Sequence, residues 1–271
     1  MSRSETVMQA INYIETHFSD RLDIGAVASS LCYSKYHLHR MFTEAADISM
    51  HEYIVRRRLT EAARLIVFTR MPIADIALFA GYGSRQAFSD VFKAMYKCPP
   101  AEFRAHKHFY PLLLPYRLNP AEPYTVFKNP MPSFARPDDA ASWMELVRMT
   151  IDGYPCFDAA AYKAAFYKSM EEHRALILKD NHIAAGGLIF NPCNNSIDFF
   201  AVHPQYRGLG TEQALFAGLQ KELSGEISIT TFRERDRADT GWRAALGRLG
   251  FCERELLIEF GYPTQRMVRL F

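Results

Sequence analysis

Half of the prolines of this chain fall within one short segment. The sequence contains 14 prolines. Seven of them lie between residues 111 and 137: Pro111, Pro115, Pro120, Pro123, Pro130, Pro132 and Pro137. Because proline lacks an N–H group and clashes with the preceding helical turn, no continuous helix can run through this segment. The 271 residues are enough for two domains of ordinary size, so the sequence predicts two domains joined by a proline-rich segment.

The sequence patterns differ on the two sides of this segment. Before it, apolar residues recur at helical spacing. After it, helical stretches alternate with runs of β-branched and aromatic residues, as at 197–202 and 227–232. We therefore expect an all-α domain followed by an α/β domain. The expected boundaries are a first domain at 1–108, a docked linker at 109–132 and a second domain at 133–271.

Composition excludes several classes of protein. No uncharged apolar run approaches the roughly 20 residues that span a bilayer, and the N-terminus lacks the apolar core of a signal peptide, so we expect a cytoplasmic protein. The five cysteines are scattered without a CxxC pair, which argues against a disulfide framework and a metal site. Residues 1–108 carry 14 Lys+Arg against 11 Asp+Glu, a difference of +3, and the remainder carries 18 against 19, a difference of −1. This asymmetry gives weak support for nucleic-acid contact.

The first half contains a short helix, a break and a second helix with an exposed polar face. Ser34 is a suitable N-cap for a helix that starts at residue 35. Leu38 and Phe42 are four residues apart and should face the core. Hydrogen-bond donors and a tyrosine ring remain outside, as a helix that reads the major groove requires. These outward residues are Lys35, Tyr36, His39 and Arg40.

The same pattern returns about 50 residues later. Residues 73–80 predict a first helix, Gly81 opens a turn, and Ser84 caps a second helix at 85–96. Phe88 and Phe92 should face inward, which leaves Arg85, Gln86 and Ser89 exposed. A long helix at about 51–69, which carries Arg56, Arg57 and Arg58, separates the two patterns. It would hold two reading helices about one DNA turn, or ~34 Å, apart.

Residues 7–104 resemble the DNA-binding domain of the AraC/XylS family of transcriptional regulators. The resemblance is closest at Ile73-Ala74-Asp75-Ile76-Ala77, Gly81-Tyr82, Ser84, Phe88, Phe92-Lys93 and Pro100-Ala101-Glu102-Phe103-Arg104. It implies two helix-turn-helix modules bound to double-stranded DNA. The implied DNA-binding residues are Ser34, Lys35, Tyr36, His39, Arg40, Ser84, Arg85, Gln86 and Ser89. Asp90 stands where close relatives that bind as monomers often carry arginine, which suggests looser base reading by the second helix.

In the second half, a predicted strand ends in a glycine-bearing turn that opens directly into a helix. Such a turn presents backbone N–H groups to an anion such as pyrophosphate. The string from Val202 to Gly210 resembles the acyl-CoA-binding turn of GNAT-type N-acetyltransferases. The resemblance covers 133–271 and implies a mixed, mostly antiparallel sheet flanked by helices. It places the thioester and pantetheine arm of an acyl-CoA at Phe200, Ala201 and Val202. It places the pyrophosphate at Arg207, Gly208, Leu209, Gly210, Thr211 and Glu212.

Two residues depart from the GNAT pattern. Glu212 occupies a position that is normally Gly or Ala, and it brings an acid to the expected pyrophosphate site. Leu246 occupies the position where active members commonly carry a tyrosine that protonates the leaving thiolate. No other acid–base pair is evident, so catalytic residues are not assigned. Near the expected cleft stand Glu171, Glu172, His173 and His203, which we expect at the surface.

Aromatic residues follow the proline-rich segment where the GNAT fold receives its acceptor. The candidate pocket residues are Tyr154, Phe157, Tyr162 and Phe166. They suit a small apolar or cationic molecule, and core packing is an equally good explanation.

The sequence as a whole indicates a DNA-binding transcriptional regulator whose second domain senses a small molecule or an acyl-CoA such as acetyl-CoA. One alternative is a bifunctional regulator with an active amine N-acetyltransferase domain. Another is a second domain that only mediates dimerisation or contact with RNA polymerase, without a ligand. Both a monomer and a homodimer remain open at this point.

Overall fold

The structure is a computed structural model, and it describes residues 2–17, 22–118, 131–151, 157–259 and 261–270. The chain divides into two compact units. The first unit consists of residues 1–123 with 151–156, and the second of residues 124–150 with 157–271. Within the described ranges, no helix combines the length and the apolar composition that crossing a membrane requires.

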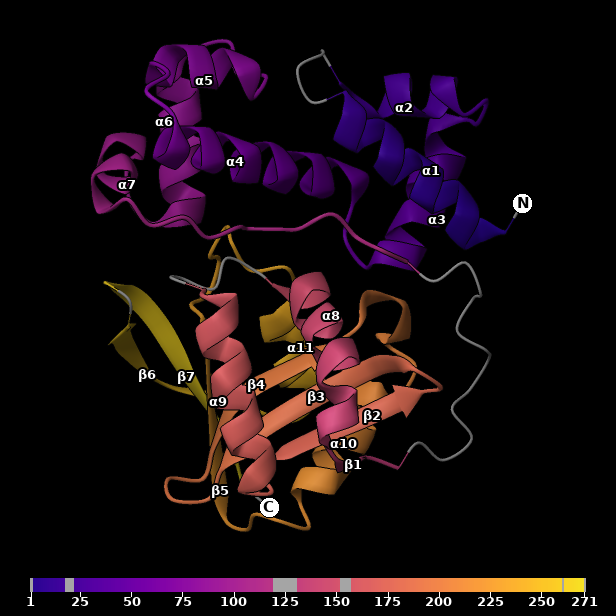
Figure 1. Ribbon diagram of the computed structural model, residues 1–271, viewed down its shortest axis with the longest axis vertical. Helices are drawn as coiled ribbons and strands as arrows, with labels where there is room; N and C mark the ends of the chain where they lie inside the picture. The colour runs from indigo at the N-terminus through magenta and orange to yellow at the C-terminus, as the bar shows by residue number, and fades with distance from the viewer. Residues whose placement is uncertain (1, 18–21, 119–130, 152–156, 260, 271) are drawn as a thin grey trace. The chain divides into compact units, whose positions relative to one another are not determined.

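The regular structure described in the first unit is helical, as the sequence predicts. Its helices are α1 (Arg3–Thr16), α2 (Ile24–Ser30), α3 (Lys35–Ala46), α4 (Met50–Phe68), α5 (Ile73–Phe79), α6 (Arg85–Tyr96) and α7 (Pro100–His106). Figure 1 shows α4 between a module of α1, α2 and α3 and a module of α5, α6 and α7. The predicted pair of helix-turn-helix modules is therefore present, with α3 and α6 as the second helix of each.

Polar side chains fix where these helices begin. The Ser34 hydroxyl accepts a hydrogen bond from the backbone N–H of the third residue of α3 at 3.3 Å, and Ser84 does the same for α6 at 3.1 Å. Asp23 caps α2 and Ser49 caps α4 in the same manner. Each cap satisfies a donor that a helix leaves unpaired and contributes about 1 kcal/mol. The predicted starts of α3 and α6 agree with the structure for this reason.

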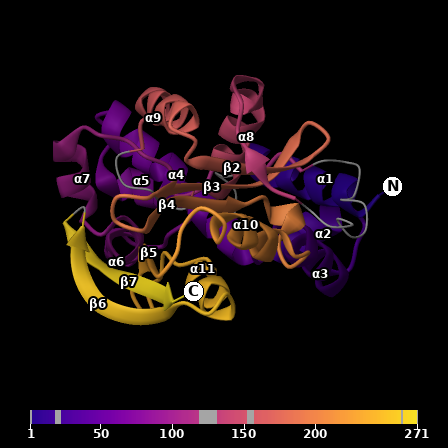
Figure 2. The same ribbon diagram turned by 90° about the horizontal axis from the view of Figure 1, so that it is seen from below.

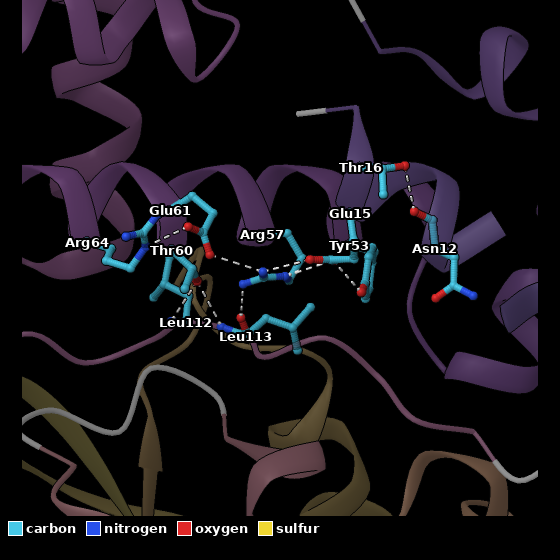
Figure 3. Close-up of polar contacts among 10 residues, drawn as sticks. All are labelled: Asn12, Glu15, Thr16, Tyr53, Arg57, Thr60, Glu61, Arg64, Leu112 and Leu113. Atoms are coloured by element: carbon cyan, nitrogen blue, oxygen red, sulfur yellow. Dashed lines mark hydrogen bonds and ion pairs between the residues drawn. The ribbon is translucent and has the colours of Figure 1, made fainter. Parts of the chain in front are cut away.

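A buried ion pair joins α1 to α4. The Arg57 guanidinium donates to both carboxylate oxygens of Glu15, at 2.9 Å from Nε to Oε1 and 2.8 Å from Nη2 to Oε2. The Tyr53 hydroxyl donates to the same carboxylate at 2.8 Å, and Glu61 accepts from Arg57 Nη2 at 3.2 Å (Figure 3). The Arg57 side chain is only 4% exposed. Burial acts against its charge, but hydrogen bonding to Glu15 raises the pKa of Arg57 overall, so the guanidinium stays charged.

The second unit is a mixed sheet flanked by helices, as the sequence predicts. Its described strands are β1 (Ser133–Phe134), β2 (Ala175–Asp180), β3 (Ile183–Asn191), β4 (Ser196–Val202), β5 (Glu226–Phe232), β6 (Cys252–Glu259) and β7 (Tyr262–Leu270). They form one sheet in the order β1-β2-β3-β4-β5-β7-β6. Its helices are α8 (Ala140–Thr150), α9 (Ala159–Glu171), α10 (Thr211–Leu219) and α11 (Trp242–Arg248). Figure 2 shows α8 and α9 on one face of the sheet and α10 and α11 on the other.

Strands β4 and β5 separate soon after they meet. Among the described strands they form the parallel pair, and they pair at Ser196 with Ser228 and at Ile197 with Ile229. Beyond these residues β4 continues beside β3 as far as Val202, and β5 continues beside β7 as far as Phe232. The later residues of β4 therefore have one backbone edge that is not paired with β5.

Glycines on β3 allow a helix to approach each face of the sheet closely. A Cβ atom at Gly186 would lie 2.7 Å from the Leu215 side chain of α10, and one at Gly187 would lie 2.8 Å from the Trp143 ring of α8. Because real Cβ atoms essentially never come so close to other atoms, both positions require glycine at this packing distance. The two apolar cores, one on each face, are built around these contacts.

Loss of the Glu15 carboxylate should destabilise the first unit strongly. Glu15→Ala leaves the buried Arg57 charge without its main partner, which typically costs about 3–5 kcal/mol. The free energy of unfolding can be measured in urea by circular dichroism at 222 nm. Trp143 and Trp242 are the two tryptophans of the chain and both lie in the second unit, so the tryptophan fluorescence transition should stay unchanged.

The matched control is Glu44→Ala. Glu44 pairs with Arg3 at 2.8 Å, but the two side chains are 44% and 49% exposed. An exposed pair contributes at most about 1 kcal/mol. Equal losses in Glu15→Ala and Glu44→Ala would show that the buried pair has no special role.

Candidate nucleic-acid interface and ligand-binding turn

The predicted reading face of α3 is exposed except at one residue. Its exposed members are Lys35, Tyr36 and Arg40. Tyr36 is 86% exposed, which is unusual for an aromatic ring. His39 is half-buried, and its Nδ1 atom has no hydrogen-bond partner among the described residues. On the opposite side Leu38 and Phe42 are fully buried, so the amphipathic orientation predicted for this helix is present.

The corresponding face of α6 carries Arg85 and Gln86 in exposed positions. The Gln86 side-chain amide donates to the Asp90 carboxylate one turn later, at 2.9 Å. Ser89 is half-buried, and its hydroxyl donates to the Arg85 carbonyl at 2.8 Å. The acid that departs from the family pattern therefore holds the glutamine side chain along the helix.

The turn of the second module packs on an arginine of α4. Gly81 has φ +80°, a backbone conformation that favours glycine. A Cβ atom at this position would lie 2.8 Å from Nη1 of Arg58. Arg58 therefore lies directly against the turn. Arg56 and Arg57 are buried and Arg58 is half-buried, so this run of three arginines supports the packing of the helices, a role that the sequence alone did not indicate.

Arg104 in α7 fastens the connection between α4 and α5. Its Nε donates to the carbonyl of Ile66 at 3.0 Å, and Nη2 donates to the carbonyl of Met71 at 2.6 Å. The Ile66 carbonyl lies in the last turn of α4, where a helix leaves acceptors unpaired, and the Met71 carbonyl lies in the connection between α4 and α5. The last residue of the resemblance to the AraC/XylS family thus fixes the angle at which the second module leaves α4.

In the second unit, the predicted glycine-bearing turn lies between β4 and α10. Gly208 has φ +71° and Gly210 has φ +88°, and no atom lies within 4 Å of a Cβ built on either. Backbone conformation, and not close packing, therefore demands these glycines. Gly210 is the N-cap of α10, and no side chain caps that helix. The first N–H groups of α10 are consequently available to an anion.

Neighbouring side chains anchor this turn. The Thr211 hydroxyl donates to the Tyr206 carbonyl at 2.9 Å, and Tyr206 donates from its own hydroxyl to Asp180 at 2.8 Å. Burial and the hydrogen bond to Asp180 raise the pKa of Tyr206, so the phenol stays a donor. Arg207 donates from Nε to the Val202 carbonyl at 3.1 Å. Phe200, Ala201 and Val202 are buried in β4, directly before the turn.

Glu212 reaches back into the turn. Its Oε1 accepts a long hydrogen bond of 3.5 Å from the backbone N–H of Gly208. Its Oε2 is buried and has no hydrogen-bond partner among the described residues. The acid therefore lies at the turn where an anionic ligand would be expected, instead of pointing away from it.

The surface position expected for His203 is wrong. This side chain is 6% exposed, and its Nδ1 accepts a hydrogen bond of 3.3 Å from the Gln205 backbone N–H. Burial, together with the nearby Arg207 charge, lowers the pKa of His203 to about 4. The imidazole of His203 is neutral in the folded protein because the turn after β4 buries it. The sequence pattern did not indicate this burial.

The aromatic candidates cluster on the face of the sheet covered by α8 and α9. Phe166 is fully buried and stacks on Trp143, with ring centroids 4.4 Å apart. Phe157 and Tyr162 are half-buried neighbours at 5.6 Å. The Phe199 ring also belongs to this cluster, and its centroid lies 5.7 Å from that of Tyr162. The candidates from the sequence did not include Phe199. Successive side chains of a strand point to opposite faces of the sheet, so its position next to Phe200 in β4 would have indicated it. Tyr154 lies outside the described residues.

Leu246, at the position of the expected tyrosine, is fully buried in α11 within the core on the opposite face. Its side chain packs with Leu249 and Phe251 in that core. This position therefore supplies an apolar contact and no hydroxyl.

The stability of the second unit should fall as the pH is lowered from about 6.5 to about 4. Folded His203 takes up a proton only near pH 4, whereas its ordinary pKa is 6.5, so the unfolded state binds more protons in this window. The slope from one such group is at most about 1.4 kcal/mol per pH unit. Urea unfolding followed by tryptophan fluorescence at several pH values measures it. His203→Asn keeps an acceptor for the Gln205 N–H and should flatten the slope; an unchanged slope would assign it to other groups.

Comparison with known protein families identifies the first unit. The family described as "Helix-turn-helix domain" matches residues 27–106. Regulatory protein SoxS of Escherichia coli is 38% identical over 104 residues, which is 38% of this chain and 97% of SoxS. The HTH-type transcriptional regulator YbfP of Bacillus subtilis is 36% identical over 104 residues, and the match covers only 35% of that protein.

Solved structures are similar to both parts of the chain. The C-terminal domain of AraT, a response regulator from Geobacillus stearothermophilus, has 30% identity and a TM-score of 0.36, covering 45% of this chain and 92% of that one. A GNAT-family acetyltransferase from Bacillus cereus has 19% identity and a TM-score of 0.39, covering 51% of this chain and 95% of that one. On the match to nearly the whole of SoxS, together with the two helix-turn-helix modules, the chain belongs to the AraC/XylS family of DNA-binding transcriptional regulators.

Proposed function

We propose that α3 and α6 both read bases in the major groove and that the second unit binds a small molecule or an acyl-CoA that changes DNA binding. The observation that carries the second part is the turn at Gly208 and Gly210, which leaves the first N–H groups of α10 without a side-chain cap. The ligand would alter DNA binding by favouring one arrangement of the two units through the proline-rich segment.

The base contacts are proposed from exposure and chemistry. Arg40 is 69% exposed and lies 4.0 Å from Glu44, a contact too long to hold the guanidinium firmly. Arg40 and Arg85 suit guanine, which offers two acceptors to an arginine fork. The amide of Gln86 suits adenine, and Asp90 fixes its orientation. Ser34 and Ser84 serve as caps and place the first turn of each helix.

For the second unit, the proposed ligand contacts fall into two groups. The backbone of Phe200–Val202, beyond the point where β4 leaves β5, is the proposed place for an amide-bearing arm such as pantetheine, and there the Val202 carbonyl already accepts from Arg207. Arg207 to Thr211 surround the place proposed for a pyrophosphate. The half-buried Phe157 and Tyr162 would border a second, aromatic site for a small apolar or cationic molecule.

A bifunctional regulator with an amine N-acetyltransferase domain is the second candidate. The intact Arg207–Gly210 turn favours acetyl-CoA as a ligand. Leu246 favours sensing over catalysis, because general acid catalysis contributes roughly 10² to 10⁴-fold and this side chain has no proton to give. The third candidate is a second unit that only mediates dimerisation or contact with RNA polymerase. Such a unit would bind no ligand, and the acetyl-CoA titration below distinguishes it from an acyl-CoA-binding unit.

Replacing a reading-helix arginine should change base preference as well as affinity. Sites selected from random-sequence DNA serve as the substrate, and dissociation constants are measured by fluorescence anisotropy. Arg40→Ala and Arg85→Ala should each weaken binding by about 5- to 150-fold, or ~1–3 kcal/mol, and relax preference at particular base pairs. Lys168→Ala removes one exposed positive charge from the second unit and should have little effect. An equal loss on every DNA sequence would contradict base reading by these arginines.

Acetyl-CoA binding should be weak in the wild-type chain and stronger in Glu212→Ala. Removing a carboxylate about 4 Å from a bound phosphate relieves ~1 kcal/mol or more of repulsion, or at least about fivefold in affinity. Isothermal titration measures the affinity, and a thiol-release assay with a panel of amines in the same samples measures turnover. Glu222→Ala, an exposed acid just after α10, is the control. Binding with turnover would promote the bifunctional candidate, and no binding in either variant would contradict the acyl-CoA proposal.

A further inference from the structure

The segment that follows α7, residues 110–118, crosses the whole first unit. We call it the strap. At its start Tyr110 packs on Tyr96 and Phe103 of the second module, with ring centroids 5.3 and 5.5 Å apart. The Tyr96 and Tyr110 hydroxyls donate to each other's backbone carbonyls at 3.4 and 3.3 Å. This end of the strap is therefore attached to the module that carries α6.

The middle of the strap is bound to α4. The backbone N–H groups of Leu112 and Leu113 both donate to the Thr60 hydroxyl oxygen, at 3.1 and 3.2 Å. The Leu113 carbonyl accepts from Nη1 of Arg57 at 2.9 Å. Figure 3 shows these contacts beside the Glu15 carboxylate. The ion pair that joins α1 to α4 thus also holds the strap.

The far end of the strap is attached to the first module. The Tyr116 ring lies 5.5 Å from that of Tyr53 in the first turn of α4, and Tyr53 in turn meets the ring of Phe42 in α3 edge-on at 5.4 Å. The Leu118 N–H donates to the Met8 sulfur in α1 at 3.2 Å. Nine extended residues span about 30 Å, close to the roughly 28 Å of the 19-residue α4. The strap is consequently a second connection between the modules, parallel to α4.

The strap lies outside the part of the chain that defines the family match, which ends at residue 106. The family model therefore does not describe the strap or its contacts.

We infer that the strap fixes the placement of α3 relative to α6 and so sets the spacing of the two DNA half-sites that the chain accepts. Arg104 ties the second module to α4, and the Glu15–Arg57 pair ties α1 to it. The strap adds attachments at both modules and at Thr60, so neither module can turn about α4 without breaking contacts with the strap. The inference rests on the proposal that both helices read DNA.

Loosening the strap should reduce discrimination between half-site spacings. The full chain is titrated with a selected DNA site and with versions that have one base pair added or removed between the half-sites. In Thr60→Val the two N–H groups lose their acceptor, and the one-base-pair penalty should fall by about tenfold. Thr60→Ser keeps the hydroxyl and should retain the wild-type penalty.

A second variant changes only the strap. Leu112→Gly with Leu113→Gly removes its apolar side chains and leaves α4 untouched, and circular dichroism at 222 nm confirms that the helices are intact. The penalty should fall here as well. If both folded variants keep the wild-type penalty, or lose affinity equally at every spacing, the inference is wrong. If the wild-type chain itself ignores spacing, two-helix reading fails, and this outcome is distinct from a failure of the strap.

Discussion

The first unit depends on the buried charge of Arg57. Arg57 is almost fully removed from solvent, and it stays charged because Glu15, Glu61 and a backbone carbonyl of the strap receive its N–H groups. An ion buried in this way tolerates few alternative arrangements, since any movement of α1, α4 or the strap leaves a donor unpaired. Arg57 therefore determines how α1, α4 and the strap fit together. It does so although it belongs to neither α3 nor α6, the helices whose exposed faces are proposed to read DNA.

The second unit depends on a different constraint, the early separation of β4 from β5. A sheet normally satisfies backbone groups on both edges of an inner strand, and here β4 leaves its partner before it ends. The turn that follows has two glycines with positive φ and opens a helix without a side-chain cap. Backbone N–H groups without a side-chain cap are thus concentrated at this turn, and the Glu212 carboxylate accepts a hydrogen bond from one N–H group of the turn, that of Gly208.

The sequence predicted those features that depend on local patterns. The two helix-turn-helix modules follow from apolar spacing and from serine caps, and the starts of α3 and α6 were predicted to the residue for this reason. The glycine turn was predicted from the residues themselves, and the mixed sheet followed from the resemblance to the GNAT family. Features that depend on contacts between distant residues were not predictable: the burial of Arg57 and His203, and the packing of Arg58 on Gly81. The i, i+4 spacing of Arg57 and Glu61 was the one local hint of the buried network.

The strap also has a direction. Leu118 lies at the end of the strap from which the chain continues to the second unit, and it is attached to α1 through a thioether sulfur, a weak acceptor. The hydrogen bonds of Leu112 and Leu113 to Thr60 and Arg57 lie farther from this end of the strap, so a chain that is pulled from Leu118 loads them second. Tension on this end would therefore reach the contact with α1 before it reached the bonds to α4.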